Sequence, residues 1–209
     1  MLSAIVSGGL GYLLGAIPTA FLLVRWKSHL DIRSQGSGNV GTFNSYQVSG
    51  SKGIAATVLV VDFFKGLVAV YLANALWPDN VANAACAGTG AVLGHNFPVW
   101  LRFRGGRGLA TGAGALLPFG WAIIVAWVLA WFAGFRLLRS VNPANAVASV
   151  LLMLVIALLP ARLLEVGLKA GVPSELYRIY AIGVFVVILV KHVQPFREYL
   201  RGKWQGKRA

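Results

Sequence analysis

The sequence predicts an all-α polytopic membrane protein with seven transmembrane helices. Of its 209 residues, 57% are hydrophobic and only 12% are charged, whereas a soluble domain usually has about 25% charged residues. The apolar residues occur in blocks of roughly 20, the length that crosses a bilayer core about 30 Å thick. Because backbone groups in lipid must be satisfied within their own segment, these blocks predict helices and not strands.

Seven segments within a single domain, residues 1–209, meet this description. The first has no Lys or Arg before Arg25, so it is predicted to be an uncleaved helix and not a signal peptide. Leu109–Phe135 contains Pro118 and is open to two interpretations, one kinked helix or two helices. The predicted spans are Leu2–Val24, Gly53–Trp77, Val81–Leu101, Leu109–Pro118, Phe119–Phe135, Val141–Pro160 and Leu176–Val190.

The distribution of basic residues favours seven spans over six. With seven, all 19 Lys and Arg lie on one side of the membrane except Lys65, inside a span, and Arg162, Lys169 and Arg178 on the other side. With six, they divide almost evenly. The positive-inside rule then places the N-terminus outside and the C-terminus in the cytoplasm. The net charge of +13 is explained by this orientation, so no nucleic-acid partner is expected.

The first cytoplasmic segment with residues suited to binding a ligand is RSQGSGNVGTFN, Arg33 to Asn44. Closely spaced glycines expose backbone amides that can wrap an anion, and short polar side chains add further donors. A flexible polar turn would have the same composition. The candidate residues are Gly36, Ser37, Gly38, Asn39, Gly41 and Asn44.

The second is LGHNFPVWLRFRGGRGLATG, Leu93 to Gly112. Its arginines and glycines directly precede an apolar helix, a natural phosphate site, and Arg offers bidentate donors to phosphate oxygens. The candidates are Arg104, Gly105, Gly106, Arg107 and Gly108. His95 and Asn96 stand near the cytoplasmic end of the preceding span, where a titratable group usually faces a polar cavity. The alternative is an interfacial histidine bonded to a backbone carbonyl.

Two other features are less specific. Asp62 and Lys65 are three residues apart on one helix face and can neutralise each other. The tail from Lys191 carries His192 among basic and aromatic residues, a pattern typical of attraction to anionic lipids. Cys86 is the single cysteine, and no metal site is predicted.

These motifs resemble those of the bacterial acyl-phosphate:glycerol-3-phosphate acyltransferases (PlsY-type). GSGNVGTFN is similar to that family's GSGNxGATN, and GHNFPVWLRFRGGRGLAT to GHxFPVFLxFKGGKGVAT. DFFKG matches a DxxKG element, and YLLGAIPTA a start usually written YLLGSIPxA. The agreement in order and spacing runs from about residue 10 to residue 112.

The resemblance implies seven helices in the bacterial inner membrane, with the motif loops meeting on the cytoplasmic side. The implied reaction transfers a fatty acyl group from acyl phosphate to the sn-1 hydroxyl of glycerol 3-phosphate, giving lysophosphatidate for phospholipid biosynthesis, without a cofactor, acyl-CoA or acyl-carrier protein. His95, Ser37 and Asn39 would be catalytic, and the phosphate would be held by the glycines of both loops, Asn44, Arg104 and Arg107. Asn96, Lys65 and His192 would be secondary. His95 would accept the hydroxyl proton, or a substrate phosphate would accept it while His95 positions the alcohol.

The sequence also departs from the family pattern. Gln47 stands where the family has arginine, Phe43 replaces a small residue, and Pro195 and Glu198 replace an asparagine and an arginine. Two alternatives follow: a related membrane transferase with another acceptor or donor, or a non-catalytic anionic-lipid binder or transporter. Transport is disfavoured because an alternating path usually needs polar groups at the midplane, where only Asp62 and Lys65 qualify.

Overall fold

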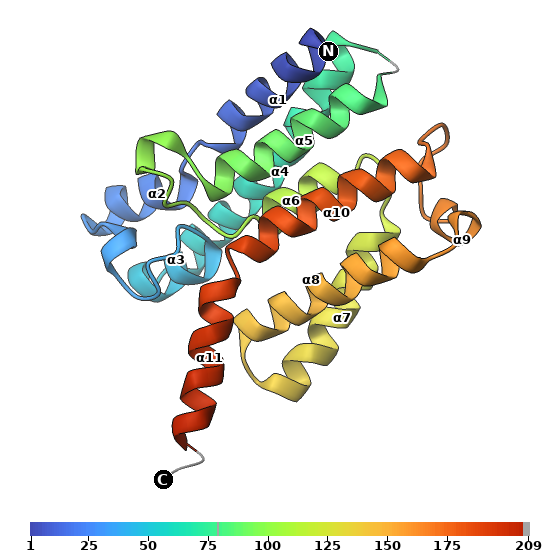
Figure 1. Ribbon diagram of the computed structural model, residues 1–209. Helices are drawn as coiled ribbons and strands as arrows, with labels where there is room; N and C mark the ends of the chain where they lie inside the picture. The colour runs from blue at the N-terminus through green and yellow to red at the C-terminus, as the bar shows by residue number, and fades with distance from the viewer. Residues whose placement is uncertain (79, 207–209) are drawn as a thin grey trace. The chain divides into compact units, whose positions relative to one another are not determined.

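The computed structural model describes residues 1–78 and 80–206, with side chains described as far as Gly202 (Figure 1). This described part is helical, and its one bridge-like pairing joins Gly120 to Leu168. The all-α prediction is therefore confirmed. The helices are α1 (Leu2–Gly15), α2 (Thr19–Ser28), α3 (Thr42–Ser49), α4 (Lys52–Leu76), α5 (Val81–Asn96), α6 (Leu109–Leu116), α7 (Ala122–Leu138), α8 (Val141–Leu158), α9 (Ala161–Glu165), α10 (Ser174–Val190) and α11 (Val193–Gly206), with 3₁₀ turns η1 (Ile32–Ser34) and η2 (Val99–Leu101).

The chain divides into two compact units, Met1–Pro118 and Phe119–Ala209. The boundary falls at Pro118, inside the stretch that the sequence left open between one helix and two. The structure resolves that choice, because α6 and α7 are separate helices. The first unit holds α1 to α6 and both glycine-rich loops, and the second holds α7 to α11.

Bare glycine backbone sets the close packing of the first unit. A Cβ at Gly11 in α1 would lie 2.0 Å from the carbonyl oxygen of Ala87 in α5. One at Gly66 in α4 would lie 2.1 Å from that of Thr111 in α6. Small residues allow such approach between helices in membranes, where van der Waals packing replaces the hydrophobic drive of water. Both helix pairs carry part of the site, so this packing positions it.

The predicted first span is broken at Pro18. α1 ends at Gly15 and α2 begins at Thr19, because Pro lacks a backbone N–H and its ring clashes with the preceding turn. Carbonyls at the break bond to other segments: that of Ile17 accepts from Lys65 Nζ at 3.0 Å, and that of Ala16 accepts from Trp100 Nε1. The break thus ties α1 to α4 and to the second loop.

The third predicted span ends earlier than the sequence indicated, so the part of the second motif after Asn96 lies outside α5. α5 ends at Asn96, five residues before the predicted end of the span at Leu101, and η2 follows Pro98. Arg102 and Phe103 then adopt left-handed backbone, with φ of 53° and 62°. The helix stops here because the residue before a proline disfavours helical geometry.

Within the described residues, three helical stretches are long and apolar enough to cross a membrane: Leu2–Ser28, Lys52–Leu76 and Val141–Leu158. A fourth is added if Ser174–Val190 and Val193–Gly202, bent by 50°, form one span. α6 has only eight residues, about 12 Å of helix, which is less than half a bilayer core of about 30 Å. Helices suited to a membrane are thus confirmed, whereas the count of seven and the orientation stay predictions.

In the second unit, a side chain closes the end of α8. Arg178 in α10 donates from Nη2 to the carbonyl of Leu159 at 2.9 Å and from Nη1 to those of Ala157, at 3.0 Å, and Ile156. The last carbonyls of a helix lack intrahelical partners. Arg178 therefore has a structural role in holding α8 and α10 together.

Candidate active site

Asn44 organises the first glycine-rich loop from inside. Its Oδ1 accepts the backbone N–H of Ser37 at 2.9 Å. Its Nδ2 lies 3.2, 3.1 and 3.0 Å from the carbonyls of Ile32, Gln35 and Asn39. The side chain is 1% exposed and is occupied by the loop itself. The geometry gives Asn44 a role in shaping the loop, and direct contact with phosphate stays a prediction.

The loop depends on glycine where it turns. Gly36 and Gly38 have φ of 56° and 68°, a region that glycine adopts without strain. A Cβ at Gly36 would also lie 2.3 Å from Asn44 Oδ1. Gly36 and Ser37 are exposed and Asn39 is half-buried. The N–H groups of Ser37 and Gly38 donate within the loop, to Asn44 Oδ1 and to the carbonyl of Gln35, so these two amides serve the loop's own structure.

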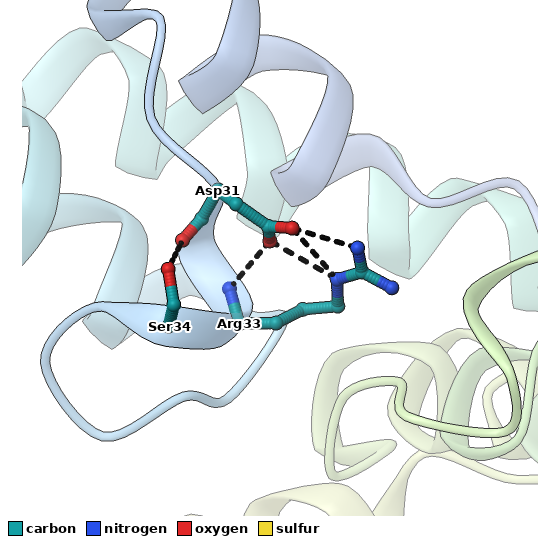
Figure 2. Close-up of polar contacts among 3 residues, drawn as sticks. All are labelled: Asp31, Arg33 and Ser34. Atoms are coloured by element: carbon teal, nitrogen blue, oxygen red, sulfur yellow. Dashed lines mark hydrogen bonds and ion pairs between the residues drawn. The ribbon is translucent and has the colours of Figure 1, made fainter.

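An ion pair fixes the start of this loop (Figure 2). Arg33 donates from Nη2 to Asp31 Oδ2 at 2.7 Å, from Nε to Oδ1 at 3.0 Å, and from its backbone N–H to Oδ1 at 2.9 Å. Ser34 Oγ donates to the Asp31 carbonyl at 3.0 Å. The hydrogen bonds from Arg33 lower the pKa of Asp31 to about 2, and the guanidinium lies 5.1 Å from the Phe21 ring centroid. Arg33 is therefore committed to the loop's own structure.

The second loop folds back onto the end of α5. The N–H groups of Gly105 and Gly106 donate to the carbonyls of Asn96, at 3.2 Å, and His95, at 3.0 Å. A Cβ at Gly106 would lie 2.0 Å from His95 Nε2 and 2.7 Å from the carbonyl oxygen of Val40 in the first loop. The two loops, more than 60 positions apart in the sequence, therefore meet at Gly106 beside the His95 ring.

Two helices begin next to this meeting point. α3 starts at Thr42, two residues after Val40, and α6 starts after Gly108, whose φ is 79°. Each N-terminus presents N–H groups without helical partners and a partial positive charge. Arg107 is half-buried and Arg104 is exposed. The meeting point combines the features of a phosphate site.

A small polar pocket lies beneath the loops. Lys65 Nζ is 2.8 Å from Asp62 Oδ1, which is 3.7 Å from His95 Nδ1. All three side chains are at most 8% exposed. The pocket is lined by Gly15, Ala16, Ile17, Pro18, Thr19, Val40, Asp62, Lys65, His95, Pro98 and Gly105. The structure thus gathers the α1–α2 break, α4, α5 and both loops around His95.

Two of these residues had no role assigned from the sequence. Asp62 was recognised only as a partner of Lys65. Thr19 was not predicted as a site residue, although in the sequence it directly follows Pro18. In the structure its hydroxyl has no hydrogen-bond partner among the described residues. A proline interrupting an apolar span was the signal, because such breaks are tolerated where the backbone lines a cavity.

The three residues to which the resemblance gives a secondary role, Asn96, Lys65 and His192, lie in different parts of the structure. Lys65 lines the pocket, and Asn96, fully buried, lies against Gly108, where a Cβ would be 2.6 Å from its Oδ1. His192 belongs to the second unit, and its Nδ1 is 2.8 Å from the carbonyl of Ile188, so its participation stays a prediction. Within the described residues, no group of three or more His, Cys, Asp and Glu could hold a metal.

The fold and site define an integral membrane protein in which two glycine-rich loops meet beside His95, at the edge of a small polar pocket. Residues 5–202 match the family described as glycerol-3-phosphate acyltransferase. A glycerol-3-phosphate acyltransferase from Mesorhizobium japonicum is 41% identical over 151 residues, covering 72% of this chain and 75% of that protein. One from Brucella abortus is 36% identical over 192 residues, covering 92% and 87%.

Solved structures agree with these relatives. The crystal structure of PlsY (YgiH), an integral membrane glycerol 3-phosphate acyltransferase, in its glycerol 3-phosphate form matches with a TM-score of 0.78 and 27% identity, over 96% of this chain and 93% of that one. Its lysophosphatidic acid form matches with a TM-score of 0.77 and 28% identity. The chain belongs to the glycerol-3-phosphate acyltransferase family, as the motif resemblance predicted.

Proposed function

We propose that the protein transfers a fatty acyl group from acyl phosphate to the sn-1 hydroxyl of glycerol 3-phosphate, giving lysophosphatidate and inorganic phosphate for phospholipid biosynthesis. The observation that carries the proposal is the contact of Gly106 with both His95 and Val40, which brings the two motif loops together around one imidazole. Family membership supports it, as does the similarity to a protein solved with glycerol 3-phosphate and with lysophosphatidic acid.

The reaction needs little covalent help from the protein. The sn-1 oxygen attacks the acyl carbonyl carbon, the bond from that carbon to the phosphate oxygen breaks, and phosphate leaves with the bonding electrons. The hydroxyl proton passes to a base. The site must orient the alcohol against the carbonyl and hold phosphate charge on preorganised donors.

The residues are proposed to divide this work between them. The N-termini of α3 and α6, with Arg104 and Arg107, hold phosphate charge, while Ser37 and Asn39 orient the substrates. His95 lies where the loops meet and can accept the hydroxyl proton. If a substrate phosphate oxygen accepts it instead, His95 holds the alcohol in place.

We further propose that the whole chain acts as one functional domain with seven spans, an outer N-terminus and a cytoplasmic C-terminus in the bacterial inner membrane. The family match covers both units, and the distribution of Lys and Arg supports the orientation. The site would then face the cytoplasm among membrane lipids.

The test uses purified protein with palmitoyl phosphate and glycerol 3-phosphate. We expect lysophosphatidate and inorganic phosphate in equal amounts, and a loss of most of the rate in His95→Ala and in Arg107→Ala. Arg162→Ala is the matched control, because Arg162 is exposed on α9 in the other unit. The proposal fails if the wild type makes no product while the Brucella abortus relative does in parallel. Product from acyl-CoA alone would favour a transferase with another donor.

A further inference from the structure

The first unit buries an ion pair that the proposed reaction does not use. Asp62 and Lys65, one turn apart in α4, are 2% and 7% exposed, and their charged atoms are 2.8 Å apart. Burying such a pair costs several kcal/mol per ion, and apolar residues of similar volume are often as stabilising. Ionisable residues inside membrane-spanning helices usually mark function, so the pair calls for a role beyond packing.

Lys65 is held by a second contact in addition to Asp62. Its Nζ donates to the carbonyl of Ile17 at 3.0 Å, in the break that Pro18 makes between α1 and α2. The ammonium group is therefore anchored between two elements, and its position fixes that of the Asp62 carboxylate.

The Asp62 carboxylate faces one edge of the His95 ring and the second loop faces the other. Asp62 Oδ1 is 3.7 Å from Nδ1, and Nε2 lies against Gly106. A carboxylate at one ring nitrogen selects the tautomer with the proton on that nitrogen, which leaves the lone pair on Nε2. The 3.7 Å separation exceeds a hydrogen bond, as is often the case for catalytic hydrogen bonds before substrate binds.

We propose that Asp62 and Lys65 are positioning residues for His95. Lys65 fixes the Asp62 carboxylate, and Asp62 holds the imidazole as the Nδ1–H tautomer, with the Nε2 lone pair on the side of Gly106, where the proposed function places the acceptor hydroxyl. This rests on the proposed function, in which His95 is the group that receives or orients the acceptor hydroxyl.

The decisive variant removes both charges at once. Asp62→Asn combined with Lys65→Met keeps the approximate shapes and leaves no unpaired buried charge, the condition under which such replacements are tolerated. We expect the double variant to fold as the wild type does, judged by its Tm in detergent. We expect kcat to fall by about 10- to 100-fold, the loss seen when the partner that orients a metal-ligating histidine is removed.

The KM for glycerol 3-phosphate should change by less than about threefold, because the interaction lost acts on the transition state and not on ground-state binding. Glu175→Gln is the matched control. Glu175 also pairs with a cation three residues along its helix, Arg178 at 3.3 Å, but it lies in the second unit. It should retain wild-type kcat.

A second readout is independent of activity. In protein labelled with ¹⁵N-histidine, the His95 ring signals are assigned by comparison with His95→Gln. We expect a protonated Nδ1 and an unprotonated Nε2 in the wild type, and a mixture of tautomers in the double variant. Unchanged ring signals in the folded double variant, or a kcat within about threefold of the wild type, would overturn the positioning role. If the wild type makes no product, the proposed function fails, and the ring signals alone decide the positioning role.

Discussion

Replacing Gly106 by alanine tests the meeting of the two loops directly. The added Cβ would lie 2.0 Å from His95 Nε2 and 2.7 Å from the Val40 carbonyl oxygen, whereas ordinary contacts begin at 3.4 Å. The ring or the loop must therefore move by more than 1 Å. Overpacking of this kind costs about 1–3 kcal/mol of stability, and a misplacement of about 1 Å near reacting groups can cost roughly 100-fold in rate. We expect kcat to fall by about 100-fold.

The assay measures release of phosphate from palmitoyl phosphate in the presence of glycerol 3-phosphate, with Tm recorded for each variant. Gly53→Ala is the matched control, because a Cβ there would meet only Ser51 Oγ at 3.7 Å. An activity of Gly106→Ala within about threefold of the wild type would refute the reasoning. It would mean that neither the His95 ring nor the contact with Val40 has to stay in place for the reaction.

Two further predictions concern the first loop. In Asn44→Asp the donor that faces three carbonyls is replaced by a carboxylate, which leaves buried acceptors unpaired at about 1–3 kcal/mol. The KM for glycerol 3-phosphate should rise about tenfold or more, whereas Asn80→Asp, the same change at the N-cap of α5, should be neutral. For Asp31, whose pKa falls from 3.8 to about 2 on folding, the bond to Arg33 stabilises the fold fully above pH 3.8 and the stabilisation is lost as the pH falls through about 2. The Tm difference between wild type and Asp31→Asn should therefore be steady near neutral pH and vanish between about pH 4 and pH 2; a difference that persists below pH 2 would contradict this origin.

The helices were predictable where apolar runs are long and uninterrupted. Gly53–Trp77 and Val141–Pro160 correspond within two residues to α4 and α8, because in such runs hydrophobicity and helix formation agree. The predicted helix ends were less accurate where an apolar run continued past a proline. Val81–Leu101 was extended five residues too far past Asn96, since hydropathy alone does not register that Pro98 ends the helix.

The residues of the site could be predicted from their chemical type, but the role of each residue could not. The glycines, His95 and the arginines were recognisable because amides, imidazole and guanidinium suit phosphate chemistry. The inward orientation of Asn44 could not be predicted, because an asparagine that shapes a loop and one that binds a ligand have the same sequence signature. α3 was not predicted either, since Thr42–Ser49 has no apolar stripe; in the structure it is bounded by Gly41 and Gly50 and packs against α4 and α2.

Interruptions of helices account for the location of the site. A continuous membrane helix uses all its backbone groups internally, so it offers a ligand only side chains. Here the first predicted span is broken at Pro18, α5 ends at Asn96, and α3 and α6 begin directly after Gly41 and Gly108. These interruptions supply the Ile17 carbonyl that holds Lys65 and the helix N-termini of α3 and α6 near His95. The buried ion pair Asp62–Lys65 stands where they converge. The helix breaks, the polar pocket and the ion pair therefore form one site. Removing both charges of the ion pair should lower kcat while leaving Tm unchanged.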